Sequence, residues 1–375
     1  MSHVMDNRAG KGTALYTRRL IEELLKNDRL EITLVHYEKT DDPLYTKARE
    51  ILIPRLRLPF ATRFARTLLF FWKYRKERFD IIHWFQPRLY PFFWLAPARC
   101  IVVTAHGAGD ITAPGQFPLS RRIYNFLMIH FNHRITAIIG VSEFGKQEII
   151  EHYRASRDRV HAIYNGGGES FKQLAKHSSQ KLILERYGIK SPFILDVSRL
   201  EPHKNVDTLI RAYEILRRES DFSHSLVIVG ARRFEAEKTL ALARASFYAK
   251  NIMFLDFVKQ ADLNALYSAS DVFVFPSLNE GFGLPLVEAF ASGTPVVTSS
   301  ATALPEVAGD SAIIVDPADV SALAGAIRRI LSDARLRDML VQKGLVRAQV
   351  FTWSETARKT SDLYERLVST FSSVR

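Results

Sequence analysis

The stretch "DVFVFPSLNEGFGLPLVEAFASGTPVV", residues 271–297, indicates how the chain folds. It opens with an apolar run that is typical of a buried strand. Pro285 fits the first turn of a helix, where its missing N–H costs nothing. Gly293 fits the position just past a helix end, where a positive φ is favoured. We therefore expect a short helix over about 285–292, with the next strand beginning at Thr294.

Strand-like and helix-like segments alternate along the rest of the chain. Helical periodicity is clear over 13–26 and 205–219, for example. The strand-like runs are almost continuously apolar, as expected for parallel strands that helices cover on both faces. These runs lie at 31–37, 79–85, 100–106, 135–142, 192–199, 224–230, 251–257, 271–277, 294–300 and 311–316. The alternation predicts the α/β fold class, with doubly wound parallel sheets.

The length of 375 residues predicts two domains. A segment rich in Gly, Ser and Lys at 161–181 separates two series of strands and helices, and we place the linker there. We expect an N-terminal domain over 1–170 and a C-terminal domain over 180–353. Residues 354–375 then belong to a final amphipathic helix that follows the second series.

Composition limits the classes of protein. The single cysteine, Cys100, excludes an internal disulfide and favours a reducing compartment. The N-terminus has no apolar signal region, and no apolar run approaches the ~20 residues that a spanning helix needs. We therefore expect a cytoplasmic protein. The net charge of +12 favours an anionic partner, such as nucleic acid, a phosphorylated substrate or acidic lipid, although solubility alone also explains it.

Two glutamates in the opening stretch, Glu280 and Glu288, suit recognition of a nucleotide sugar. Glycines 281 and 283 let the backbone approach a ligand closely, and the helix N-terminus behind them favours an anion such as a diphosphate. Glu288, inside the helix, is placed to accept hydrogen bonds from a vicinal diol such as ribose. Glu280, in the loop, is placed to reach a second polyol. The alternatives are a carboxylate that stabilises the helix dipole and a solvated loop acid.

A second motif, "VSRLEPHKN" at 197–205, follows the first strand of the second half. Its Arg199 and Lys204 are suited to bind a diphosphate and to stabilise a departing nucleotide. The alternative is a pair of solvated surface cations. The sequence contains no Asp-x-Asp and no group of His, Cys, Asp and Glu with metal-ligand spacing. We therefore expect no metal and no cofactor.

These motifs resemble those of the retaining glycosyltransferases of the GT-B fold, family GT4. The family pattern of Glu, seven residues and Glu, followed by Gly-Thr-Pro-Val-Val, reads "EGFGLPLVEAFASGTPVV" here, and its Arg/Lys motif reads "SRLEPHKNVDTLIRAY". The resemblance is strong over about 192–330 and weaker in the first half. It implies two Rossmann-like domains that face a cleft, with the nucleotide sugar held mainly by the second and the final helix crossing back to the first.

The resemblance also implies roles for individual residues. Arg199 and Lys204 would bind the diphosphate, and Glu288 the ribose. His106 of "VVTAHGAGD" matches a histidine that contacts the donor sugar beside the reaction centre. The donor-binding set comprises Gly12, Arg199, Lys204, Phe257, Val258, Glu280, Gly281, Phe282, Gly283, Leu284 and Glu288, with the base near 257–258, and the catalytic set comprises His106, Glu280, Lys204 and Arg199. Gly12 is what remains of a glycine loop that follows the family's first strand, here only "HVMDN".

The reaction that the resemblance implies is transfer of a hexose from a nucleotide-diphosphate sugar by front-face displacement, with retention and without metal. The donor would be GDP-mannose or a UDP-hexose. Mannose is suggested by similarity to bacterial polysaccharide mannosyltransferases. The acceptor would be a glycan or a lipid-linked sugar in cell-surface polysaccharide synthesis.

A basic and aromatic segment at 54–76 suggests a membrane surface as a partner. A basic amphipathic helix with aromatic residues is typical of membrane interfaces. The residues expected to contact lipid are Arg63, Arg66, Phe70, Phe71, Trp72, Lys73 and Arg75, and 118–134 resembles a second such segment. We therefore expect peripheral binding to the anionic inner face of the cell membrane. The alternative is an ordinary helix with its apolar side inward.

Other classes of protein fit the sequence less well. A glycosidase would need Glu280 and Glu288 on either side of one bond, yet both lie on one loop–helix unit, and Arg199 would have no role. A sugar-nucleotide epimerase of the same fold and a non-catalytic carbohydrate-binding protein stay open as alternatives. A nucleic-acid-binding protein would show steeply salt-dependent binding to any polynucleotide.

Overall fold

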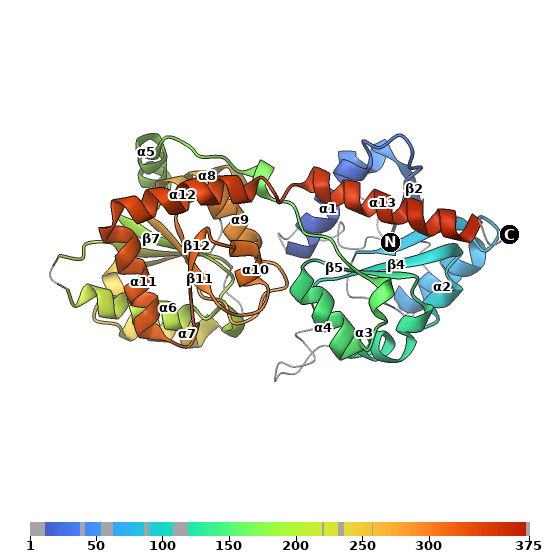
Figure 1. Cartoon of the computed structure of the whole chain (residues 1–375), viewed down its shortest axis with the longest axis horizontal. Coiled ribbons are helices and arrows are strands. Elements are labelled where there is room, and N and C mark those ends of the chain that lie inside the picture. Colours follow the sequence, from blue (N-terminus) through green and yellow to red (C-terminus); the bar gives the residue numbers. More distant parts are fainter. Residues whose placement is uncertain are drawn as a thin grey trace. The chain divides into compact units, whose positions relative to one another are not determined.

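The computed structural model describes residues 12–37, 42–53, 63–85, 89, 91–107, 119–219, 221–231, 236–256 and 258–372. The chain divides into two compact units. Unit 1 comprises Met1–Gly166 and Trp353–Arg375, and unit 2 comprises Gly167–Thr352. Each unit contains parallel β-structure flanked by helices (Figure 1). The predicted α/β class with doubly wound parallel sheets is confirmed.

Unit 2 is built on a six-stranded parallel sheet with the order β12-β11-β10-β7-β8-β9. Its strands are β7 (Phe193–Val197), β8 (Ser225–Val229), β9 (Ile252–Leu255), β10 (Val272–Phe275), β11 (Val296–Ser299) and β12 (Ala312–Val315). Its helices are α5 (Lys176–Tyr187), α6 (Val206–Arg217), α7 (Ala236–Ala245), α8 (Gln260–Ala269), α9 (Leu284–Ala291), α10 (Leu304–Ala308), α11 (Val320–Ser332) and α12 (Ala334–Ala348).

The strand order of unit 2 reverses between β7 and β10. The chain leaves β7 toward β8 and β9 on one side, and leaves β10 toward β11 and β12 on the other. In open parallel sheets, ligands bind outside the carboxyl ends of the strands at such a switch point. The loops that follow β7 and β10, which hold both sequence motifs, therefore lie side by side.

Side chains of alternate strand residues fill the two faces of this sheet. Val272 and Val274 of β10 belong to the core formed with α6 and α11. Phe273, between them, points to the other face, where its ring lies 5.2 Å from that of Tyr267 of α8. The sheet is thus buried on both faces, which explains why its strands are apolar throughout.

Unit 1 contains two separate parallel sheets among its described residues. The smaller joins β1 (Thr33–His36) to β2 (Arg49–Leu52), and the larger has the order β3 (Phe79–Trp84), β4 (Ala98–Ala105), β5 (Ala137–Gly140) and β6 (Val160–Ala162). The helices are α1 (Gly12–Leu24), α2 (Arg63–Lys73), α3 (Leu119–Phe131), α4 (Glu143–Tyr153) and α13 (Trp353–Ser372).

The last helix, α13, packs in unit 1 although the whole of unit 2 precedes it in the chain. Trp353 lies edge-on to Tyr16 of α1, with ring centroids 5.9 Å apart. The hydroxyl of Thr356 donates to the carbonyl of Tyr164 at 2.8 Å. Figure 1 shows α13 alongside α1. The prediction of a final helix associated with the N-terminal half is confirmed.

The short helix at the centre of the opening stretch is α9, Leu284–Ala291, with Pro285 in its first turn. Gly293 has φ 69°, as expected just beyond a helix end. All ten predicted strands are present, and the structure adds β2 and β6. These two are short, and neither contains a continuous apolar run, so periodicity did not reveal them. The "HVMDN" segment lies outside the described residues.

Candidate active site

The ion pair between Lys204 and Glu280 forms the centre of the candidate site in unit 2. Lys204 ends a short 3-10 helix, Pro202–Lys204, after β7, and Glu280 lies in the loop after β10. The Lys204 ammonium contacts Oε1 of Glu280, and only 12% and 13% of these side chains are exposed. The buried Ser277 hydroxyl lies 2.8 Å from the same carboxylate oxygen. The structure therefore brings together one residue from each sequence motif.

Backbone hydrogen bonds hold the two loops in place. Asn205, in the left-handed conformation at φ 59°, donates from Nδ2 to the carbonyls of Pro276 at 3.0 Å and Pro317 at 2.8 Å. The N–H of Glu280 donates to the hydroxyl of Thr302 at 2.9 Å. Thr302 has φ 54°, an uncommon conformation for a β-branched residue. These contacts fix the relative positions of Lys204 and Glu280 before any ligand binds.

Glu288 lies in the second turn of α9 and is buried. The hydroxyl of Tyr267 donates to its Oε2 at 2.9 Å. Burial raises the pKa of Glu288 to about 7, because the charged carboxylate loses its hydration, whereas the Tyr267 hydrogen bond acts in the opposite direction. A buried carboxyl with this pKa and one phenol partner retains acceptor capacity for a ligand hydroxyl.

Asp196, in β7, is a second buried carboxyl close to the ion pair. Ser198 donates from Oγ to its Oδ1, and within the described part of the chain Oδ2 has no hydrogen-bond partner. Burial raises the pKa of Asp196 to about 7, and the ammonium of Lys204 partly opposes that shift. The less exposed part of the site therefore combines Lys204 with the carboxyls of Glu280, Asp196 and Glu288, and the last two have pKa values near neutrality.

Arg199 is more accessible than Lys204. Its Nη1 lies 2.8 Å from Oε1 of Glu201, and 42% of its side chain is exposed. A half-exposed guanidinium on the loop after β7 is able to exchange this partner for a ligand phosphate at low cost, because a solvated ion pair contributes little free energy.

The glycine loop presents backbone donors next to Glu280. Gly283 has φ 104°, and a Cβ there would come within 2.7 Å of Leu304 Cδ2, so the position requires glycine. The N–H groups of Gly283 and Leu284 donate no hydrogen bond within the described part of the chain. The side chain of Phe282 turns inward instead and packs edge-on against Phe351, with centroids 5.4 Å apart. The loop therefore offers main-chain rather than side-chain contacts to an anion.

His106 lies in unit 1, just past the end of β4. Its Nε2 is 3.0 Å from the carbonyl of Phe85, so Nε2 carries the proton and donates it. Burial lowers the pKa of His106 to about 4. The ring also packs edge-on against Tyr16, with centroids 4.9 Å apart. His106 is therefore a neutral imidazole whose Nδ1 is a hydrogen-bond acceptor.

The structure gives less detail on the remaining residues of the predicted donor-binding set. Gly12 is exposed and begins α1, and a Cβ added there would meet no other atom within 4 Å. Gly281 is half-buried between Glu280 and Phe282. Val258 is half-buried before α8, and Phe257 lies outside the described residues. Among the described residues, no group of three or more His, Cys, Asp and Glu is arranged to hold a metal ion.

Part of the proposed membrane segment is buried. In α2, Phe70 and Phe71 point into the core of unit 1. Arg66 donates to the carbonyls of Tyr37 and Ile53 at 2.8 and 2.9 Å, and so joins α2 to the smaller sheet. Contrary to expectation, Phe70 and Phe71 do not form an outer surface, because the 3.6-residue period that aligns them with Thr67 places all three inward.

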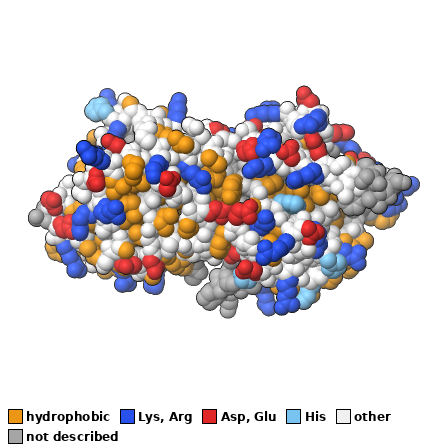
Figure 2. Space-filling model, viewed as in Figure 1, with side chains coloured by type: hydrophobic (Ala, Val, Ile, Leu, Met, Phe, Trp, Pro, Cys, Tyr) orange, Lys and Arg blue, Asp and Glu red, His pale blue; other side chains and the backbone are white. Residues whose placement is uncertain are grey.

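The C-terminal end of α2 is exposed. Trp72 is 63% exposed, and the guanidinium of Arg75 lies 4.6 Å from its ring centroid. Lys73 is exposed beside it, whereas Arg63 is half-buried over the ring of Tyr37 at 5.5 Å. On the face of the chain drawn in Figure 2, Lys and Arg side chains are distributed among acidic ones rather than gathered in one patch. None of the described helices is long and apolar enough to cross a membrane.

Sequence reasoning missed several residues of the site. Tyr267 contacts Glu288 from α8, Thr302 accepts from the backbone of Glu280, and Ser277 contacts the carboxylate itself. Ser277 and Asn205 could have been predicted, since they lie inside the motifs at 271–297 and 197–205. Tyr267 lies in α8 and Thr302 in the turn before α10, and no local pattern connects them to the site.

Comparisons with known proteins agree with this architecture. The family model for glycosyl transferases group 1 matches residues 179–347, and that for glycosyltransferase family 4 matches residues 10–166. O-antigen chain mannosyltransferase B of Escherichia coli is 32% identical over 269 residues, which cover 71% of this chain and 70% of that protein. MMP alpha-(1->4)-mannosyltransferase of Mycolicibacterium hassiacum is 33% identical over 259 residues, covering 67% and 60%.

A solved structure extends the comparison to the fold of the whole chain. HepE of Anabaena in complex with UDP-glucose has a TM-score of 0.73 at 19% identity, and the alignment covers 98% of both chains. Two units with parallel sheets, together with both family matches, define a glycosyltransferase of the GT-B fold. The chain belongs to glycosyltransferase family 4, and the resemblance noted in the sequence is confirmed.

Proposed function

We propose that the protein transfers mannose, with retention and without metal, from GDP-mannose to a glycan or lipid-linked acceptor in cell-surface polysaccharide synthesis. The main support for the proposed donor site is the ion pair between Lys204 and Glu280, which lies at the switch point of the unit 2 sheet. Mannose as the sugar is supported by the names of the two curated relatives, both mannosyltransferases. A UDP-hexose is the competing donor, because HepE binds UDP-glucose in the same fold.

The charges of the site suit departure of a nucleoside diphosphate. When the bond between the anomeric carbon and the phosphate oxygen breaks, negative charge develops on the diphosphate. Lys204, Arg199 and the N–H groups of Gly283 and Leu284 supply positive charge and donors for it. Glu280, held by Lys204, accepts hydrogen bonds from sugar hydroxyls.

The displacement itself needs no protein base. The acceptor hydroxyl attacks the anomeric carbon from the face that the diphosphate leaves, and its proton passes to the departing phosphate oxygen. This balance of bonds and protons retains the anomeric configuration. The ribose of the nucleotide binds Glu288, which Tyr267 orients from the neighbouring helix.

A thermal-shift screen tests the donor site directly. GDP, UDP, ADP and dTDP, each with and without its sugar, are added to the protein in the presence of a metal chelator. We expect GDP and GDP-mannose to raise the melting temperature by the largest amount, since a ligand that binds only the folded state stabilises it. A shift with UDP and its sugars alone would mean that the donor is a UDP-hexose and not GDP-mannose. The absence of a shift with any nucleotide would contradict the proposed donor site.

We also propose that unit 1 binds an anionic membrane surface. The surface proposed here is an apolar patch outside α2. Ring contacts join Phe92, Trp94, Phe131 and Phe126 into this apolar patch. Leu95 follows Trp94 in the chain, and the side chains of Phe92, Leu95 and Phe126 are exposed. Trp94 stacks on Phe131 with centroids 5.0 Å apart, and exposed His130, His133 and Arg134 adjoin it. Exposed aromatic residues near a basic side chain such as that of Arg134 are typical of membrane interfaces. A lipid-linked acceptor would be reached from such a surface.

A further inference from the structure

The hydrogen bond that His106 makes holds only one atom of its ring. Nε2 lies 3.0 Å from the carbonyl oxygen of Phe85, and the ring can still turn about that bond. The direction of Nδ1, which is predicted to accept a hydrogen bond from the donor sugar, therefore depends on what packs against the imidazole. Tyr16 of α1 makes such a contact. Its ring lies edge-on to that of His106, with centroids 4.9 Å apart and an angle of 88° between the planes.

Tyr16 is itself held firmly in unit 1. Its side chain is fully buried, and its ring packs edge-on against Phe85 and against Trp353 of α13, with centroids 6.4 and 5.9 Å apart. Its hydroxyl lies 3.2 Å from Oγ1 of Thr104. Rotation of this side chain would break the hydrogen bond and open a gap in the packing, so the ring keeps one orientation.

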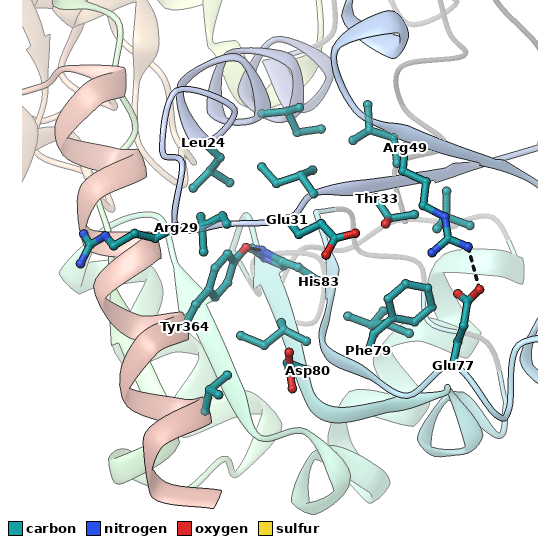
Figure 3. Close-up of a pocket in the computed structure, with 18 of the residues that line it drawn as sticks. Leu24, Arg29, Glu31, Thr33, Arg49, Glu77, Phe79, Asp80, His83 and Tyr364 are labelled. Atoms are coloured by element: carbon teal, nitrogen blue, oxygen red, sulfur yellow. Dashed lines mark hydrogen bonds and ion pairs between the residues drawn. The ribbon is translucent and has the colours of Figure 1, made fainter. Parts of the chain in front are cut away.

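A chain of hydrogen bonds links Tyr16 to the last helix. Thr104 ends two residues before His106 in the sequence, and its Oγ1 lies 2.8 Å from Nε2 of His83 in β3. Nδ1 of His83 meets the hydroxyl of Tyr364 of α13, as Figure 3 shows. Burial lowers the pKa of His83 well below its ordinary value. The ring is therefore neutral, and it donates at one nitrogen and accepts at the other.

We propose that Tyr16 is a positioning residue for His106 and that α13 holds Tyr16 in place through Trp353 and Tyr364. In this role Tyr16 touches no substrate. It keeps Nδ1 of His106 in one direction and shields one side of the imidazole from water. The inference rests on the proposed function and on the predicted contact between His106 and the donor sugar. It gives α13, which follows the whole of unit 2 in the chain, a part in orienting a residue of unit 1.

An NMR titration of His106 tests the contact without any substrate, and His106→Gln identifies the signal by its loss. Tyr16→Leu replaces the ring by a smaller apolar side chain. We expect the pKa of His106 to rise from about 4 toward its ordinary value of ~6.5, because water then reaches the imidazole. Arg121, whose charge also lowers this pKa, is the same in every variant. Tyr153→Phe removes a buried hydroxyl that donates to Asn125 at 3.2 Å, and this control should leave the pKa unchanged.

A double-mutant cycle with His106→Gln tests the effect on transfer. In the wild-type background we expect Tyr16→Leu to lower kcat by ~3- to 10-fold, the range that an aromatic pair contributes. Affinity for the nucleoside diphosphate, which unit 2 is proposed to bind, should stay normal. In the His106→Gln background the same substitution should change kcat by less than ~2-fold, because the side chain that Tyr16 positions is gone.

Tyr16→Phe keeps the test valid if Tyr16→Leu does not fold. This variant retains the ring and loses only the hydrogen bond to Thr104. We expect it to melt close to the wild type and to change the pKa of His106 and kcat in the same directions as Tyr16→Leu, by smaller amounts. Tyr153→Phe, with the same loss of one phenol hydroxyl in unit 1, should keep the wild-type kcat.

Two results would overturn the inference. If the pKa of His106 is the same in the wild type and in the Tyr16 variants, Tyr16 does not shield the imidazole. If Tyr16→Leu lowers kcat equally in both backgrounds, Tyr16 supports the fold of unit 1 and not the position of His106. A wild type that transfers no hexose would contradict the proposed function instead, and the titration, which needs no substrate, would still decide whether Tyr16 shields His106.

Discussion

The ammonium of Lys204 contacts the carboxylate of Glu280, which lies 76 residues further along the chain, and both side chains are almost buried. Neither residue is near the other in sequence. They meet because the strand order of the sheet reverses between β7 and β10, which places the loops after these strands together. The pair links the residue proposed to stabilise the leaving diphosphate with the residue proposed to hold the sugar.

Replacing Lys204 should slow turnover far more than it weakens binding. We expect Lys204→Ala to lower kcat by about 10²-fold or more, because charge on the leaving group develops mainly in the transition state. Steady-state kinetics with the nucleotide sugar measure this, and Lys238→Ala, at an 89% exposed lysine of the same unit, is the control. A nearly normal kcat in Lys204→Ala would contradict the assigned role.

Glu288 should make donor binding depend on pH. Its pKa of about 7 means that it is mostly protonated at pH 6 and mostly charged at pH 8. Two ribose hydroxyls donate best to the charged form, so affinity for the nucleotide sugar should rise about tenfold between these values. Calorimetric titration measures the affinity, and Glu288→Gln should reduce the dependence to what Asp196 contributes. Tyr267→Phe should move the midpoint to higher pH, because the lost hydrogen bond stabilises the carboxylate.

An affinity for the nucleotide sugar that is equal at pH 6 and pH 8 would exclude Glu288 as the ribose ligand. The nucleotide sugar is the suitable probe, because its diphosphate is esterified at both ends and does not titrate in this range. A free nucleoside diphosphate would add its own titration to the curve.

Asp196 should reduce stability as the pH rises. Its folded pKa of about 7 lies above the value near 3.9 expected in the unfolded chain. The folded state therefore binds more protons between these values, and the free energy of unfolding decreases from about pH 4 to pH 7. The full effect is at most about 4 kcal/mol. Asp196→Asn should melt at a higher temperature than the wild type at pH 8, with the difference shrinking toward pH 5.

A difference in melting temperature that is the same at every pH in this range would contradict the prediction. The substitution would then act through packing and not by removing a titrating carboxyl. Glu288 has a similar pKa and contributes a parallel slope. The comparison is therefore made between the wild type and Asp196→Asn, in which Glu288 is unchanged.

The apolar patch of unit 1 should control membrane binding. Leu95 and Phe126 are 60% and 54% exposed, so replacing them by Ser costs the fold little. We expect the double variant to bind vesicles rich in phosphatidylglycerol more weakly by about tenfold or more, since each apolar side chain contributes through its burial in lipid. Phe247→Ser, at a 93% exposed phenylalanine of unit 2, is the control. If the wild type, the double variant and Phe247→Ser sediment equally with vesicles, the proposed membrane-binding patch is wrong.

The sequence predicted the strands of unit 2, four of the six described strands of unit 1 and the short helix α9, because apolar runs, Pro285 and Gly293 act locally. It also predicted one site that contains Lys204, Glu280 and Glu288, of which the structure brings Lys204 and Glu280 into contact. It did not predict that Tyr267 orients Glu288 or that Thr302 holds the loop, because both contacts depend on tertiary packing. The inward direction of Phe70 and Phe71 was missed for a related reason: a dense aromatic segment looks the same whether its rings face lipid or a core.

His106 is predicted to contact the donor sugar, and its replacement tests this role. Because Nε2 donates to the carbonyl of Phe85, only Nδ1 is left to accept a hydrogen bond, and a sugar hydroxyl is a suitable donor. His106→Gln retains an amide that can donate to Phe85 but lacks an acceptor at the Nδ1 position. We therefore expect normal nucleotide affinity and a decrease in kcat/KM for transfer of about tenfold or more.

The pH profile of transfer distinguishes this role from acid–base catalysis. With a pKa of about 4, His106 stays neutral from pH 5.5 to pH 8, so its titration should contribute no change in rate over that range. A proton-transferring histidine would instead give an acidic limb with a midpoint near its ordinary pKa of ~6.5. If such a limb appears in the wild type and is absent from His106→Gln, the imidazole exchanges a proton during the reaction. The assignment of His106 as a neutral acceptor would then be wrong.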